Sequence, residues 1–287
     1  MKNIPVRQLT LPAKIQPAAG RFKIRRVEDI MGQNDLAHNL HRHSFFFILA
    51  IREGYGQHEI DFTPYEVSAN SVFFLRPGQV HQLQLKAGSK GYLLEFDHEF
   101  YSPKEQTSAQ RLRRASNKNH CILETSRFNK IYHTLAYMFE EFTGREPGYN
   151  EVIQSNLDIF CIEYIRQGSS AVVAAAHTYT QERLEEFLEL LQKHVITNKQ
   201  VADYLDLMHL SAYQLNDITK SSIGKTPSEL INEQIILEAK RHLLATSNQI
   251  KDVAEILGYE DVSYFIRFFK KHTGYSPYAF RRQASKF

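Results

Sequence analysis

Three histidines in the N-terminal half are spaced so that their side chains could bind a metal ion together. His41 and His43 are separated by one residue, and His81 follows a turn at Pro77 and Gly78. Neutral imidazoles bind zinc and iron, so three of them could hold either ion. The same side chains could instead line a pocket for a small molecule or make structural hydrogen bonds. The sequence leaves these interpretations open, and we expect no resident metal or cofactor.

Basic residues at the C-terminal end form a second set of side chains whose chemistry could serve a function. The net charge of the chain is only +3, but no acidic residue follows Asp261. Arginine and lysine beside a DNA duplex neutralise its phosphates. The alternative is a solvated surface. The basic residues of this stretch are Arg267, Lys270, Lys271, Arg281, Arg282 and Lys286.

A repeat in the C-terminal part of the chain would position these basic side chains. Residues 201–230 and 253–280 are two diverged copies of one unit, and their openings are 52 positions apart. Each copy predicts a short helix, a tight turn and a second helix that begins after a capping residue, Ser211 or Asp261. Apolar residues three positions apart give each second helix one buried and one exposed face. This order is that of a helix-turn-helix, whose recognition helix enters the major groove of DNA.

A further helix is predicted to join the two copies, because Ile231, Ile235, Ala239 and Leu243 are spaced four positions apart. A single helical hairpin arises easily by chance, but a joined pair does not. With its motifs the chain resembles the AraC/XylS family of bacterial transcription regulators. The motifs are A-K-R-x-L-L at 239–244, V-A-E-I-L-G-Y at 253–259, S-Y-F-x-R-x-F-K-K at 263–271 and T-G-Y-S-P-Y-x-F-R at 273–281.

The resemblance implies that outward side chains of the two second helices read DNA bases. Arg267 is suited to a bidentate contact with guanine, worth about 1–3 kcal/mol of discrimination. Lysines are expected to bind phosphates and to set the orientation without reading sequence. The expected base-contacting residues are Tyr213, Gln214, Asn216, Asp217, Ser263, Tyr264 and Arg267, and the expected phosphate-contacting residues are Lys220, Lys270 and Lys271.

The first recognition helix departs from the family pattern at two positions. Many members have arginine where this chain has Asp217, and an aromatic residue where it has Thr219. An aspartate can accept a hydrogen bond from cytosine N4, but DNA phosphates repel it. Alternatively, Asp217 forms an ion pair with Lys220, three positions later on the helix. The sequence leaves both roles open.

Short β-rich runs separated by glycine, proline and asparagine predict the fold of the N-terminal half. They span residues 45–51, 58–62, 71–75, 81–85 and 92–96. Such spacing is typical of a small antiparallel barrel or a double-sheet jelly roll. The resemblance implies a cupin-like effector domain, but cupin enzymes add a glutamate soon after their paired histidines, and this chain has no carboxylate between His43 and Glu53. The candidate effector-binding residues are His41, His43, Phe45, Phe47, Arg76, His81, Tyr92 and Glu95.

Two amphipathic helices are predicted after these strands, near residues 128–142 and 152–165. In the family they form an antiparallel pair through which two subunits associate; alternatively, they only cover the barrel. The expected fold class is α+β, with a cupin-like β-barrel or jelly roll, a helical dimerisation segment and a C-terminal all-α double helix-turn-helix domain. The expected boundaries are 1–125 for the effector domain, 126–168 for the dimerisation segment, 169–180 for a linker and 181–287 for the DNA-binding domain.

The cysteines and the apolar runs predict where the chain acts. Cys121 and Cys161 lie in unlike contexts and are expected to be free thiols in a reducing cytoplasm, with a redox-sensing pair as the alternative. The N-terminus has no long apolar core, and no apolar run approaches the ~18 residues that a membrane span needs. We therefore expect a cytoplasmic protein that is neither secreted nor inserted in a membrane.

Together these features predict a sequence-specific DNA-binding transcriptional regulator, an activator on family grounds, that is not an enzyme. Its expected partners are double-stranded DNA, RNA polymerase, a small-molecule effector and a second copy of the chain. Two other functions stay open. One is a cupin-type metalloenzyme with an accessory DNA-binding domain, and the other is a ligand-free interaction module that docks another regulator.

Overall fold

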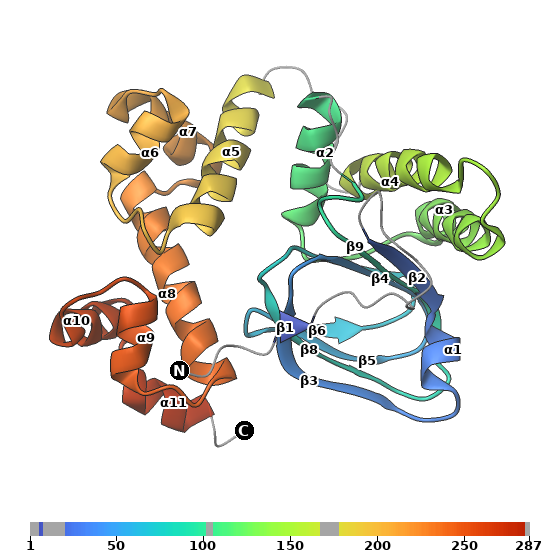
Figure 1. Cartoon of the computed structure of the whole chain (residues 1–287), viewed down its shortest axis with the longest axis horizontal. Coiled ribbons are helices and arrows are strands. Elements are labelled where there is room, and N and C mark those ends of the chain that lie inside the picture. The colour runs from blue at the N-terminus through green and yellow to red at the C-terminus, as the bar shows by residue number, and fades with distance from the viewer. Residues whose placement is uncertain (1–5, 8–20, 102–105, 167–177, 285–287) are drawn as a thin grey trace. The chain divides into compact units, whose positions relative to one another are not determined.

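The computed structural model describes residues 6–7, 21–101, 106–166 and 178–284 (Figure 1). The chain divides into two compact units, Val6–Ser170 and Ala171–Phe287, and each has hydrophobic cores of its own. Most of the expected linker, at positions 169–177, lies outside the described residues. The linker therefore stays a prediction.

Two five-stranded sheets share a core in the first unit (Figure 1). All of their neighbouring strands are antiparallel except the first pair of the first sheet, which is parallel. Of the two predicted forms, the double-sheet one is therefore found. In spatial order the first sheet holds β1 (Val6–Arg7), β3 (Leu36–His43), β8 (Val80–Leu85), β5 (Gly56–Ile60) and β6 (Thr63–Val67), and the second holds β10 (His120–Ile122), β7 (Ser71–Leu75), β4 (Phe46–Glu53), β9 (Lys90–Phe96) and β2 (Phe22–Arg26).

Strand β4 is apolar on both faces because each face meets a different core. Phe47 and Leu49 pack between the two sheets, whereas Phe46 and Ile48 pack outside the second sheet. Successive side chains of a strand point to opposite faces, so one continuous apolar run fills both layers. Phe46 and Phe47 accordingly point to opposite faces of the second sheet.

Helices cover the outer face of the second sheet. They are α2 (Gln106–Ser116), α3 (Thr125–Gly144) and α4 (Tyr149–Ile165), and the short α1 (Val27–Met31) packs into the core between the sheets. Both predicted amphipathic helices, α3 and α4, are confirmed. Tyr137 of α3 and Ile159 of α4 are about half exposed, so these helices also offer apolar side chains to a partner. Association of two subunits through them stays a prediction.

Every regular element among the described residues of the second unit is a helix. Ser211 accepts a hydrogen bond from the backbone N–H of Gln214, and Asp261 accepts one from the backbone N–H of Ser263 at 2.7 Å, so both predicted caps are confirmed. None of the described helices in either unit combines the length and the apolar character that crossing a bilayer requires. The helices of the second unit are α5 (Thr178–His194), α6 (Val201–Met208), α7 (Ala212–Ile223), α8 (Pro227–Ala245), α9 (Ile250–Ile256), α10 (Val262–Thr273) and α11 (Pro277–Ala284).

Candidate nucleic-acid interface and effector site

Helix α8 carries both helix-turn-helix units, one on each half (Figure 1). Leu230 and Ile235 in its first half share a core with α5, α6 and α7. Ala239 and Leu243 in its second half share a core with α9 and α10. Because apolar area is buried at both ends, the two recognition helices, α7 and α10, are fixed toward opposite ends of one helix.

A lysine in the segment between α5 and α6, just before the first helix-turn-helix unit, bonds to the turn of the second. The Nζ of Lys199 donates to the backbone carbonyls of Ile196, at 2.6 Å, and Gly258, at 3.1 Å. The same ammonium lies 5.2 Å from the centre of the Tyr259 ring, in the range of a cation–π contact. Gly258 has φ +69°, and a Cβ there would lie 2.8 Å from the Ile196 carbonyl oxygen. No local pattern in the sequence signals this contact, because its partners are 59 residues apart.

All ten predicted DNA-contacting residues lie on exposed surface of the two recognition helices. Tyr213 is 81% exposed and Tyr264 is 53% exposed, whereas Leu215 and Phe265, on the opposite faces, are fully buried. The exposed residues are Tyr213, Gln214, Asn216, Asp217 and Lys220 on α7, and Ser263, Tyr264, Arg267, Lys270 and Lys271 on α10.

Arg267 lies beside the residue that caps its own helix. Its Nη2 is 3.7 Å from Oδ2 of Asp261, and the two side chains are 69% and 61% exposed. The other carboxylate oxygen, Oδ1, accepts the hydrogen bond from Ser263. The guanidinium is therefore largely exposed and forms a long ion pair with Asp261 through one of its nitrogens.

The first recognition helix is built differently. Gln214 closes a capping box, since its Oε1 accepts a hydrogen bond from the backbone N–H of Ser211 at 2.9 Å. The Nζ of Lys220 approaches the Gly224 carbonyl at 3.5 Å, and over the described residues no ion pair joins Lys220 to Asp217. Asp217 thus presents an exposed carboxylate where the second copy presents Arg267.

Arg281 in the basic C-terminal stretch contacts the fold. Its Nε donates to the carbonyl of Leu243 at 2.7 Å, and its Nη1 donates to the carbonyl of Asn248 at 2.6 Å. Burial lowers the pKa of this half-buried guanidinium. Arg281 fastens α11 to the end of α8, which is a structural role rather than the phosphate contact that the stretch as a whole suggested.

In the first unit, the structure brings the three candidate histidines together between the sheets. His41, His43 and His81 are buried, and each offers a nitrogen within 4.8 Å of those of the other two. His81 Nε2 lies 2.7 Å from His43 Nε2, and His81 Nδ1 lies 2.8 Å from Nε2 of a fourth buried histidine, His58. Burial, followed by nearby histidines, lowers the pKa of His58 to about 3. Burial likewise lowers the pKa of His81, so these imidazoles are neutral at pH 7.

Aromatic rings and an ion pair adjoin this cluster. The ring of His43 lies 4.3 Å from that of Phe45 and stacks on Phe47 at 5.4 Å. Glu95 is the cross-strand partner of Phe47, so their side chains share one face of the sheet. Oε2 of Glu95 lies 3.1 Å from Nη2 of Arg25. The inner face therefore carries candidate residues with imidazole, aromatic and carboxylate groups.

Two of the candidate effector residues lie elsewhere. Tyr92 belongs to the outer core of the second sheet, where its ring lies 5.0 Å from Tyr132 and 5.8 Å from Phe139 of α3. Arg76 follows β7 and donates to Asn117 Oδ1. The structure does not group these two with the histidines. Tyr92 and Glu95 are three positions apart on β9, so their side chains point to opposite faces of the sheet.

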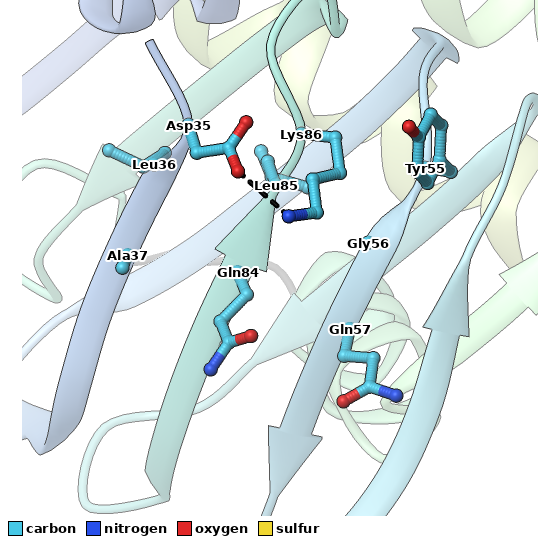
Figure 2. Close-up of a pocket in the computed structure, with 9 residues that line it drawn as sticks. All are labelled: Asp35, Leu36, Ala37, Tyr55, Gly56, Gln57, Gln84, Leu85 and Lys86. Carbon is cyan, nitrogen blue, oxygen red and sulfur yellow. Dashed lines mark hydrogen bonds and ion pairs between the residues drawn. The ribbon is translucent and has the colours of Figure 1, made fainter.

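A hollow of about 420 Å³ lies on the first sheet, away from the histidines (Figure 2). The side chains of Gln57 and Gln84 are exposed cross-strand partners there, on the face opposite the core. At its rim Lys86 Nζ and Asp35 Oδ2 form an ion pair at 2.8 Å. No predicted effector residue lines it; its lining is Asp35, Leu36, Ala37, Tyr55, Gly56, Gln57, Gln84, Leu85 and Lys86.

Two family profiles match the two parts of the chain described above. Residues 31–111 match the AraC-like ligand binding domain, and residues 204–283 match a helix-turn-helix domain. The chain belongs to the AraC/XylS family of transcriptional regulators. The resemblance and the α+β fold class inferred from the sequence are thereby confirmed.

Relatives of this family member cover different shares of its length. The HTH-type transcriptional activator RhaS of Klebsiella pneumoniae (strain 342) is 24% identical over 242 residues, which are 83% of this chain and 85% of RhaS. The bifunctional transcriptional activator/DNA repair enzyme AdaA of Bacillus subtilis (strain 168) is 32% identical over 111 residues, 37% of this chain, and the match spans 53% of AdaA. Among solved structures, ToxT of Vibrio cholerae O395 is 18% identical with a TM-score of 0.41, over 92% of this chain and 98% of ToxT.

Proposed function

We propose that this chain is a sequence-specific DNA-binding transcriptional activator that a small molecule regulates through the N-terminal sandwich. The observation that carries the proposal is the pair of recognition helices, each with a buried apolar face and an exposed polar face, packed on one helix. Such a face fits the major groove, where base edges present distinct hydrogen-bonding patterns. The named relative RhaS is a transcriptional activator, which supports the direction of regulation.

In this proposal the two recognition helices read successive major-groove segments on one face of the duplex, ~34 Å apart. Arg267 reads guanine, and the uncharged exposed residues around it add further base contacts. Lys220, Lys270 and Lys271 bind phosphates and orient the unit. Asp217 favours cytosine at the first half-site and excludes a close phosphate there.

Regulation would start between the sheets, where imidazole, aromatic and carboxylate side chains gather. A ligand changes the activity only if it binds one state of the protein more tightly than the other. We propose that two copies associate through α3 and α4, supported by the exposed Tyr137 and Ile159, and that the DNA-bound form contacts RNA polymerase.

We further propose that the chain is not an enzyme. AdaA carries a repair activity in its name, but the match spans only about half of AdaA's length, whereas 85% of the activator RhaS is matched. The competing proposal, a metalloenzyme with an accessory DNA-binding domain, requires turnover of a small molecule that is lost when the metal is removed and kept when DNA binding is impaired.

Selection of bound sequences from random duplex DNA with the full chain at fixed salt tests the proposed function. Enrichment of two short boxes about one helical turn apart is expected. Arg267→Ala should weaken binding to the selected site about 5- to 140-fold and relax the preference at one position, which corresponds to about 1–3 kcal/mol. Lys118→Ala, which removes an exposed charge of the other unit outside α3 and α4, is the matched control and should change neither quantity. Salt-sensitive binding without an enriched motif would reject sequence-specific reading.

A further inference from the structure

Four buried histidines from three strands meet between the two sheets. They come from β3, β5 and β8, and all four are at most 5% exposed. We propose that His41, His43 and His81 bind a divalent transition-metal ion such as Zn²⁺, and that His58 positions His81 for this role. The proposal goes beyond the regulation of DNA binding and does not depend on it.

The spacing of the nitrogens suits such an ion. Nitrogen atoms from the three rings lie within 4.8 Å of one another, and the closest pair, His43 Nε2 and His81 Nε2, is 2.7 Å apart. Nitrogen ligands of a tetrahedral zinc, each about 2.0–2.1 Å from the ion, lie roughly 3.3 Å from one another. The closest pair is shorter than this value and no pair exceeds 4.8 Å, so the three rings would have to move apart by side-chain rotation to admit the ion.

Hydrogen bonds outside the cluster select suitable tautomers. His41 Nδ1 lies 2.6 Å from the backbone carbonyl oxygen of Asn39. A carbonyl only accepts, so Nδ1 carries the proton and the buried Nε2 keeps its lone pair. When His81 donates from Nδ1 to His58 Nε2, at 2.8 Å, its own Nε2 also presents a lone pair toward His43. A partner on the far ring nitrogen is the usual device that orients a histidine ligand.

The same arrangement explains the contact between His43 and His81 without metal. One of the two Nε2 atoms must then carry a proton and donate it to the other across 2.7 Å. In the metal-bound form His43 instead carries its proton on Nδ1, and both Nε2 lone pairs face the ion. Each imidazole stays neutral, so no proton is gained or lost.

Three protein ligands leave a fourth position open at the ion. The rings of Phe45 and Phe47 flank His43 and shield the cluster, so a water molecule or an oxygen atom of an effector would complete the coordination. The cluster therefore resembles a ligand-accepting site more than a closed structural one.

Titration of the chelator-treated full chain with Co²⁺ and Zn²⁺ tests the proposal. We expect one equivalent of Co²⁺ to bind with the intense visible absorption of four-coordinate cobalt, and Zn²⁺ to displace it and raise the melting temperature. His43→Gln should abolish the absorption. His58→Gln should retain it but weaken binding about 10- to 100-fold, as expected for a positioning residue. His133→Gln, on the exposed face of α3, should behave as the wild type.

The wild-type measurement decides the matter even if a substituted chain fails to fold. Six-coordinate cobalt absorption, or none, in the folded wild-type chain would overturn the proposal. So would an unchanged spectrum and affinity in a folded His43→Gln variant. Either result would leave DNA selection by the same protein unaffected, so the failure of the metal site is distinguishable from the failure of the proposed function.

Discussion

The ion pair between Asp261 and Arg267 makes a testable prediction about DNA affinity. Asp261→Asn removes the carboxylate charge but keeps a side chain of nearly equal capping strength, so α10 should still begin at the same residue. The substitution releases Arg267 from the only ion pair that it forms among the described residues. We expect a guanine contact to draw the guanidinium away from Asp261, so Asp261→Asn should bind the selected operator more tightly than the wild type.

The geometry of the pair sets the size of the gain. The charged atoms are 3.7 Å apart, and the side chains are 69% and 61% exposed, so the dielectric constant of water applies. Coulomb's law then gives about 1.1 kcal/mol, close to the upper end of measured surface pairs. At about 1.4 kcal/mol for each tenfold change, the operator affinity should rise by at most about sixfold, and less at higher salt.

Fluorescence anisotropy with labelled operator DNA at two salt concentrations measures this gain. Glu260→Gln is the matched control, because it removes an exposed charge one position away, and the described residues hold no ion pair to Glu260. Repeating Asp261→Asn in an Arg267→Ala background completes a double-mutant cycle. The reasoning is refuted if Asp261→Asn gains no more than Glu260→Gln, or if its gain persists undiminished without Arg267.

Three further predictions concern other parts of the chain. Lys270→Ala should weaken binding to all DNA sequences alike and reduce the slope of log affinity against log salt by about 0.9, and a selective loss at one base would contradict a phosphate contact. Burial raises the pKa of the Cys121 and Cys161 thiols, so both should react slowly with Ellman's reagent at pH 7 in the native chain, yet rapidly in denaturant. Fast native reaction of either thiol would contradict this. Gly258→Ala should lower the free energy of unfolding by about 1–3 kcal/mol in urea titrations, because alanine is strained at positive φ and its Cβ would meet a carbonyl oxygen at 2.8 Å; an unchanged transition would show that the turn adapts.

The helical unit could be predicted in detail because its signals are local. Caps such as Ser211 and Asp261, and apolar residues three or four positions apart, act within one or two turns of helix. Helix α11 was not predicted, and its place depends on Arg281, whose partners lie 38 and 33 residues earlier in the chain. Contacts of this kind depend on the tertiary fold and leave no periodic pattern in the sequence.

The sandwich was predicted only where its strands are apolar. Strand β7 was located with the bounds that the structure shows, because every residue from Ser71 to Leu75 is buried. Strand β3 was missed because the inward residues of its second half are His41 and His43, which a hydropathy pattern reads as polar. Strand β6 contains Pro64, a residue that lowers the expectation of a strand.

The histidine cluster was only partly predictable for the same reason. The spacing of His41 and His43 and the turn before His81 drew attention to three residues. His58 lay within a predicted strand, two positions from Ile60, so alternation already placed it on the inner face. Its contact with His81, however, depends on the pairing of β5 with β8, in which Ile60 lies opposite His81, and no single strand reveals that register.

The construction of the helical unit limits how a ligand could regulate this chain. Helices α7 and α10 pack on the two halves of α8 through two cores, and Tyr259 and Phe268 pack against both of them. Lys199, just before the first helix-turn-helix unit, also bonds to the turn of the second. Packed cores resist small continuous deformations, so we expect the distance between the two recognition helices to be the same with and without a ligand. On this expectation, an effector would not act by changing the spacing of the boxes that one chain reads. We infer that it acts instead on whether the helical unit is available to DNA, or on how the units of two copies are placed on a longer operator.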